Sequence, residues 1–154
     1  MESPQSGWMS LSLKAGEENF LMAASYAPYD SLRDLIEGLS ALLTGSEGMT
    51  VRWNCEPEEF DFRMTVNDDG DRVAFKVIRY AGHRRRQEGD GQTVFSLHGS
   101  KIEVCQPFWR ALRDLQRRAS TDVFESNWKR KFPRRELQQL TRLIREKAKG
   151  ESHA

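Results

Sequence analysis

The sequence has no apolar run approaching the length of a membrane span and no apolar leader segment. A helix that crosses a bilayer needs about 20 mostly apolar residues in succession. Residues 1–7 are polar and acidic, without the basic start and apolar stretch of a secretory signal peptide. With 154 residues the chain has room for one domain with a real core. We therefore expect a cytoplasmic protein with one domain over 8–148 and flexible tails at 1–7 and 149–154.

Cysteine is scarce, since only Cys55 and Cys105 occur, each in an apolar stretch. Free cysteines in such surroundings usually behave as small core residues, so we expect two buried thiols. A disulfide requires that the fold bring the two residues close together. Neither C-x-x-C nor H-x-x-x-H spacing accompanies them, and the sequence therefore predicts no metal site.

Recognisable catalytic and nucleotide-binding motifs are also lacking. Of the three histidines, His83 lies beside an arginine run, His98 beside a glycine and His153 near the C-terminus. None forms a local motif with a Ser or Cys nucleophile. The phosphate-binding patterns G-x-x-x-x-G-K-[ST] and G-x-G-x-x-G do not occur. We predict no catalytic residue, no cofactor and no enzymatic activity, while a site assembled from distant residues such as His98 stays open.

Charge is abundant and unevenly distributed along the chain. Residues 1–100 carry 10 Lys/Arg and 16 Asp/Glu, whereas residues 101–154 carry 14 and 7, so their net charges are −6 and +7. Such an asymmetry indicates oppositely charged surfaces. The four Trp and eight Phe argue against disorder, because large apolar side chains need a core in which to be buried.

Alternation of apolar and polar residues predicts strands. The pattern occurs at 8–13, 49–55, 60–66 and 73–79, while 20–26 is expected as the second strand of an N-terminal hairpin and 93–97 as one more short strand. The segment Glu59–Tyr80 gives the strongest hairpin signal, since the turn 67–71 consists of Asn, Asp and Gly, which suit positive φ. One face of this sheet is expected to be apolar and the other largely wet.

Helical spacing of apolar residues predicts helices over about 32–43, from about 102 onward, around 121–129 and over 134–147. Asp30 or Ser31 is expected to cap the first of these helices. Pro107 predicts that the second one either starts near Gln106 or is kinked there. Strands and helices thus occur in separate runs. This order predicts an α+β fold, with an antiparallel sheet of about five to six strands and helices packed on one face.

Four carboxylates cluster around Pro57: Glu56, Glu58, Glu59 and Asp61. Paired carboxylates can act as acid and base or bind a divalent cation. Here they straddle a turn and a strand entry, and Glu59 and Asp61 are expected to share the solvent face of that strand. We interpret them as a solvated acidic rim, the most suitable place for a basic partner protein to bind.

Two basic clusters raise nucleic acid as an alternative partner. They are Arg84, Arg85, Arg86 and Lys129, Arg130, Lys131. Trp128 and Phe132 interleave with the second cluster and could stack on bases, although their spacing equally suits core residues beside the last helix. A sequence pI of 7.8 is lower than that of a typical nucleic-acid-binding domain. The default interpretation is a solvated helix face.

The segment 51–62 (VRWNCEPEEFDF) with its following hairpin, and the later pattern Trp128…Phe132-Pro133, span about half of the chain. Together they resemble small bacterial α+β proteins, some of which are immunity proteins against polymorphic or contact-dependent toxins. The resemblance implies a non-enzymatic protein-interaction module that binds and neutralises a toxin, and it assigns no functional residue. The alternative is a nucleic-acid-associated or regulatory protein that uses the basic C-terminal helices.

Overall fold

The computed structural model describes residues 1–82 and 91–152. The predicted basic residues Arg84, Arg85 and Arg86, together with His83 and His153, lie outside the described residues.

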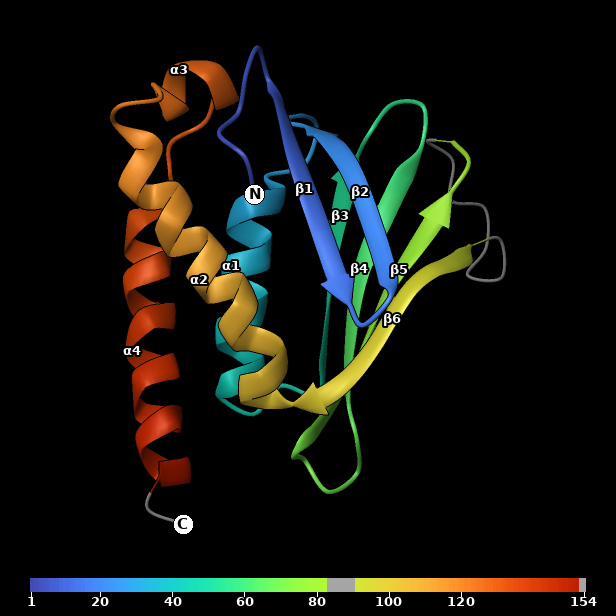
Figure 1. Cartoon of the computed structure of the whole chain (residues 1–154), viewed down its shortest axis with the longest axis vertical. Coiled ribbons are helices and arrows are strands. Elements are labelled where there is room, and N and C mark those ends of the chain that lie inside the picture. The colour runs from blue at the N-terminus through green and yellow to red at the C-terminus, as the bar shows by residue number, and fades with distance from the viewer. Residues whose placement is uncertain (83–90, 153–154) are drawn as a thin grey trace.

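Six strands form two antiparallel sheets, which confirms the α+β prediction (Figure 1). A two-stranded sheet pairs β1 (Trp8–Ala15) with β2 (Glu18–Ser25). A four-stranded sheet runs in chain order through β3 (Gly48–Asn54), β4 (Glu59–Val66), β5 (Arg72–Tyr80) and β6 (Gln92–Ser100). The predicted hairpin is therefore β4–β5, the centre of the larger sheet.

Four helices complete the domain: α1 (Ser31–Leu43), α2 (Lys101–Ala119), α3 (Phe124–Trp128) and α4 (Arg134–Ser152). Helix α1 contacts β3, and α2 contacts β5 and β6. Helix α4 packs on α1 and α2 on the side away from the sheet (Figure 1). The helices thus cover one face of the larger sheet, as predicted. No helix among residues 1–82 and 91–152 combines the length and apolarity needed to cross a membrane.

Aromatic side chains from several elements meet on the covered face of the sheet. The rings of Phe62 and Phe75 lie edge to face with centroids 5.5 Å apart, and Phe108 of α2 also lies edge to face with Phe75, at 5.6 Å. At the other end, Phe20 of β2 contacts Phe60 at 5.1 Å. Edge-to-face pairs stabilise a core beyond the area they bury. They join the β1–β2 hairpin, the sheet and α2 into one core.

Helix α1 forms where its apolar stripe predicts it. The stripe residues Leu32, Leu35, Ile36, Leu39 and Leu42 are all buried. Neither Asp30 nor Ser31 caps the helix as predicted. The Asp30 side chain makes no cap hydrogen bond, and the Ser31 hydroxyl donates to the carbonyl oxygen of Arg52. Ser31 therefore anchors the start of the helix to β3.

Helix α2 begins at Lys101, close to the predicted onset at about 102 and before the alternative start near Gln106. Ser100 and Glu103 form a capping box: the Glu103 N–H donates to Ser100 Oγ (3.1 Å), and the Ser100 N–H donates to Glu103 Oε2 (2.7 Å). Two helix-start donors are thereby satisfied. Pro107 then lies inside the helix.

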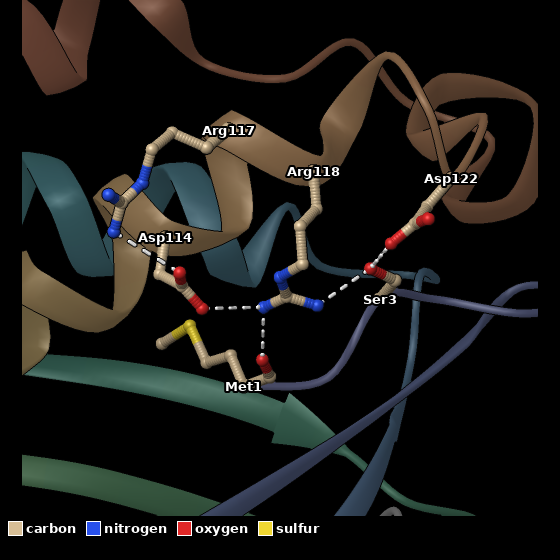
Figure 2. Close-up of polar contacts among 6 residues, drawn as sticks. All are labelled: Met1, Ser3, Asp114, Arg117, Arg118 and Asp122. Atoms are coloured by element: carbon tan, nitrogen blue, oxygen red, sulfur yellow. Dashed lines mark hydrogen bonds and ion pairs between the residues drawn. The ribbon is translucent and has the colours of Figure 1, made fainter.

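Residues 1–7, expected as a flexible tail, lie against the domain. The Glu2 N–H donates to the Ser10 carbonyl oxygen (3.0 Å). From α2, the Arg118 guanidinium donates to the Met1 carbonyl oxygen (2.9 Å) and to Ser3 Oγ (2.8 Å), as Figure 2 shows. At the other end of the chain, α4 continues to Ser152, beyond the predicted helix end.

Candidate partner-binding surfaces

Glu59 and Asp61 are buried, with only 2% and 3% of their surface exposed, so the expected solvent-facing position is wrong. They lie on the central strand β4, where their cross-strand neighbours on β5 are the large side chains of Tyr80 and Ile78. The Tyr29 hydroxyl, from the segment before α1, donates to Glu59 Oε1 (2.8 Å). Tyr29, Ile78 and Tyr80 thus lie beside the two carboxylates and exclude solvent from them.

The remaining residues of the predicted acidic rim are Glu56 and Glu58. The Arg79 guanidinium donates to Glu58 Oε1 (2.8 Å), and this hydrogen bond holds the pKa of the Glu58 carboxyl below its usual value. Glu56 is exposed, and its Oε1 accepts a hydrogen bond from Asn54 Nδ2 (3.4 Å). Of the four predicted carboxylates, therefore, two are buried and a third is ion-paired.

In the cluster Lys129–Lys131, the first two residues contact Tyr26, whereas Lys131 is exposed. The Arg130 guanidinium donates to the Tyr26 carbonyl oxygen (2.7 Å), and the Lys129 ammonium lies 5.2 Å from the centroid of the Tyr26 ring. Trp128 and Phe132 are buried, at 0% and 3% exposure, so neither ring can stack on a base. Their interpretation as core residues is confirmed.

Both cysteines are free, with Cys105 buried and Cys55 partly buried. Burial raises the pKa of each thiol to about 12, and the nearby carboxylates of Glu58 and Glu59 add to the effect at Cys55. A thiol with such a high pKa is a poor nucleophile at neutral pH, because the thiolate is the reactive form.

His98 is exposed on β6, opposite Ala74 of β5. Within the described ranges no three or more His, Cys, Asp or Glu side chains gather in a way that could hold a metal ion.

A groove of about 560 Å³ between α2 and α4, called the helical groove below, brings together residues that the sequence analysis did not connect. Its cations are Arg113 from α2 and Arg142, Arg145 and Lys149 from α4, and Glu146 contributes a carboxylate. None of these four cations forms an ion pair with another described residue.

Contacts between α2 and α4 fix the position of the helical groove. The indole N–H of Trp109 on α2 donates to Thr141 Oγ1 on α4 (2.9 Å), and the Arg113 guanidinium lies 5.2 Å from the centroid of the Trp109 ring. The spacing of Arg142, Arg145 and Lys149 places them on one side of α4. The spacing and the excess of basic residues can be read from the sequence, whereas the packing of α4 beside α2 cannot.

Comparison with protein-family models, with curated proteins and with solved structures finds no match to this chain.

Proposed function

We propose that the protein is a non-enzymatic interaction module that binds an acidic protein partner through the helical groove. The observation that supports the proposal is the set of four cations along this groove that have no acidic partner in the described part of the chain. A groove lined mainly by one sign of charge attracts a complementary surface and accelerates encounter with it.

The lining of the groove favours a protein partner over a continuous polyanion. Glu146 stands between Arg145 and Lys149 in the chain and lines the same groove. A nucleic acid would bring phosphates close to this carboxylate. A folded protein can instead place carboxylates opposite the arginines and an uncharged or basic side chain opposite Glu146, while Leu137 and Thr141 offer less polar contact.

A toxin is the first partner to test, because of the resemblance to immunity proteins described above. The binding surface differs from the one expected from sequence. Since Glu59 and Asp61 are buried, the acidic rim offers little charge to a basic cleft. The helical groove would instead cover an acidic site, such as one built from catalytic or metal-binding carboxylates.

Nucleic acid remains a second candidate for the same surface, because residues 101–154 carry a net charge of +7. Binding to a single-stranded or duplex oligonucleotide that weakens steeply with added salt would favour this candidate. Absence of binding to both oligonucleotides at low salt would exclude it.

The experiment is to co-express the protein with the products of the genes beside its own and to look for a stable complex and for protection from toxicity. The proposal predicts both for the wild-type chain, and loss of both when Arg142→Glu and Arg145→Glu are combined. Arg72→Glu combined with Lys76→Glu is the matched control, because both residues are exposed on β5. If no neighbouring product forms a complex and none is neutralised, the proposed function is abandoned.

A further inference from the structure

One edge of β1 is open next to a cavity. The Trp8 and Gln5 backbones exchange hydrogen bonds, and Ser10 accepts one from the Glu2 N–H, so the backbone groups of Trp8 and Ser10 point away from β2. Alternate residues of an antiparallel strand point their N–H and C=O groups to the same side. The backbone groups of Ser12 and Lys14 therefore point away from β2 too. Among the described residues no backbone hydrogen bond reaches these outward groups.

The cavity beside this edge, called the edge pocket below, has a volume of about 180 Å³ and lies between β1, β6 and α2. Its lining is mostly apolar and includes Leu13 from β1, Phe95 and Leu97 from β6, and Val104 and Phe108 from α2. Ser12 and Lys14 line it as well, so the open backbone groups and the cavity belong to one feature.

Helix α2 adds an acceptor to the edge pocket. Pro107 has no N–H, so the carbonyl of Glu103, four residues earlier, lacks the donor that a helix normally supplies. Both residues line the pocket. The carboxylate of Glu103 already accepts the Ser100 N–H (2.7 Å).

The protein's own chain shows that this edge accepts a strand. Residues 2–5 pair with the first part of β1, antiparallel at Gln5 and Trp8. Arg118 holds this segment in place, and its own position is fixed by the Asp114 carboxylate at 3.2 Å (Figure 2). The pairing stops after Ser10, where the edge pocket begins, since Met1 is one of its lining residues.

We infer that Ser12–Lys14 accepts an extended segment of a partner protein by strand addition, with an apolar side chain of that segment in the edge pocket. Strand addition combines backbone hydrogen bonds, which supply affinity, with pockets for alternate side chains, which supply specificity. A row of open backbone groups at strand spacing matches another polypeptide backbone better than it matches a small molecule. The site is separate from the helical groove, because the two use different faces of α2.

The register predicts the sequence of the segment. Directly opposed residues of antiparallel strands point to the same face. The residue opposite Leu13 therefore points inward to the pocket, and the residues opposite Ser12 and Lys14 point to solvent. Lys14 is exposed and has no ion-pair partner in the described part of the chain, so it favours a carboxylate opposite it. Read from its N-terminus, the segment is acidic, apolar and variable, and it ends opposite Ser12, because the chain's own N-terminus holds the next position along this edge.

The test uses a library of short fluorescent peptides that end in this acidic–apolar–variable core, titrated against the intact chain and followed by anisotropy. We expect binding by the library and not by scrambled peptides of the same composition. N-methylation of the peptide residue opposite Ser12 removes one backbone donor and is expected to weaken binding about three- to tenfold. Unchanged binding by the N-methylated peptide, or no binding by any library member, overturns the inference.

Substitutions in the protein give a second, independent readout. Ser12→Pro removes an outward N–H that β2 does not use, and it is expected to weaken peptide binding. Leu21→Pro is the matched control, because Leu21 is the cross-strand partner of Ser12 and its N–H points to the opposite edge of the hairpin. Equal loss of affinity in both variants, with both shown to be folded by circular dichroism, contradicts the inference.

A charge exchange tests the register. Lys14→Glu is expected to weaken binding of the peptide with an acidic residue opposite position 14. A peptide with lysine at that position is expected to bind this variant better than it binds wild type. Lys76→Glu, which changes an exposed lysine of β5 in the larger sheet, should alter neither affinity. If wild type and Lys14→Glu prefer the same peptide, the proposed register is wrong.

If the wild-type chain dimerises and Ser12→Pro abolishes the dimer, the occupant is a second copy and the partner-segment proposal is overturned.

Discussion

At the scale of single residues, buried thiols and a buried carboxylate are expected to affect stability more than exposed polar side chains do. Cys105 lies among core side chains, and Cys55 lies near the Glu58 and Glu59 carboxylates. Glu59 is held on the outer side of β4 by the Tyr29 hydroxyl at 2.8 Å. Because a buried group that ionises or loses its partner pays the cost of desolvation, each of these residues leads to a measurable prediction.

The two thiols predict a fall in stability at alkaline pH. Burial raises the pKa of Cys55 and Cys105 from 9.0 to about 12. Above pH 9 the unfolded chain therefore releases thiol protons that the folded chain keeps. The free energy of unfolding should fall as pH rises from 9 towards 12, by at most about 1.4 kcal/mol per pH unit for Cys105.

Urea unfolding of the wild type, Cys55→Ala and Cys105→Ala, measured at neutral pH and above pH 9, checks this prediction. Each variant should show a shallower alkaline slope than the wild type, whatever its stability at neutral pH. Parallel slopes for all three proteins would show that the thiols do not titrate differently in the folded and unfolded states.

Tyr29→Phe is expected to lower the free energy of unfolding by about 1–3 kcal/mol, because it removes a hydroxyl donor from the buried Glu59 carboxylate. Chemical denaturation at pH 7 measures the change. Tyr26→Phe is the control, since the Tyr26 side chain contacts the Lys129 ammonium through its ring. A loss as large in the control as in Tyr29→Phe would assign the effect to packing rather than to the hydrogen bond.

At the scale of elements, local pattern predicted most of the fold. Period-2 alternation located the strands of the β4–β5 hairpin, and the leucine stripe located α1, because in each case one face is buried. Of the two possibilities that Pro107 left open, a start near Gln106 is wrong, because the capping box of Ser100 and Glu103 starts α2 at Lys101. The burial of Glu59 also depends on the hydroxyl of Tyr29, which lies 30 residues earlier in the chain, and no local pattern contains that contact.

Removing the cap tests the start of α2. Ser100→Ala is expected to cost about 1 kcal/mol of stability, because the Glu103 N–H loses its side-chain acceptor at the helix start. Ser120→Ala, at the other end of the same helix, is the control and should change stability by less than about 0.5 kcal/mol. Thermal and urea denaturation provide the measurement. Equal stability of Ser100→Ala and the wild type would contradict the role of the capping box.

Arg118→Ala tests how the first residues are held. Arg118 donates to the Met1 carbonyl oxygen and to Ser3 Oγ, so its loss should increase amide hydrogen exchange at Glu2 and Gln5 several-fold (Figure 2). Arg117→Ala removes only the neighbouring contact with Asp114 and should leave that exchange unchanged. If amide exchange at Glu2 and Gln5 is the same in the two variants, the Arg118 contacts do not hold the segment, and the β1 pairing and the hydrogen bond from Ser3 Oγ to Asp122 suffice.

At the scale of the whole molecule, the excess of positive charge lies on the C-terminal helices. The helices α2 and α4 carry much of the net charge of +7 of residues 101–154, and they meet along the helical groove. The acidic residues expected to form a rim are largely buried or paired. The sequence predicted this charge asymmetry but not its location, because the groove depends on the packing of α4 beside α2.

The most direct test of the central claim is the affinity of three proteins for the partner encoded beside the gene, measured by calorimetry at low and moderate salt. The three are the wild type, the groove variant Arg142→Glu with Arg145→Glu, and the sheet control Arg72→Glu with Lys76→Glu. We expect binding at least about 30-fold weaker for the groove variant and within about threefold of wild type for the control. Equal affinities for the two variants would contradict the central claim.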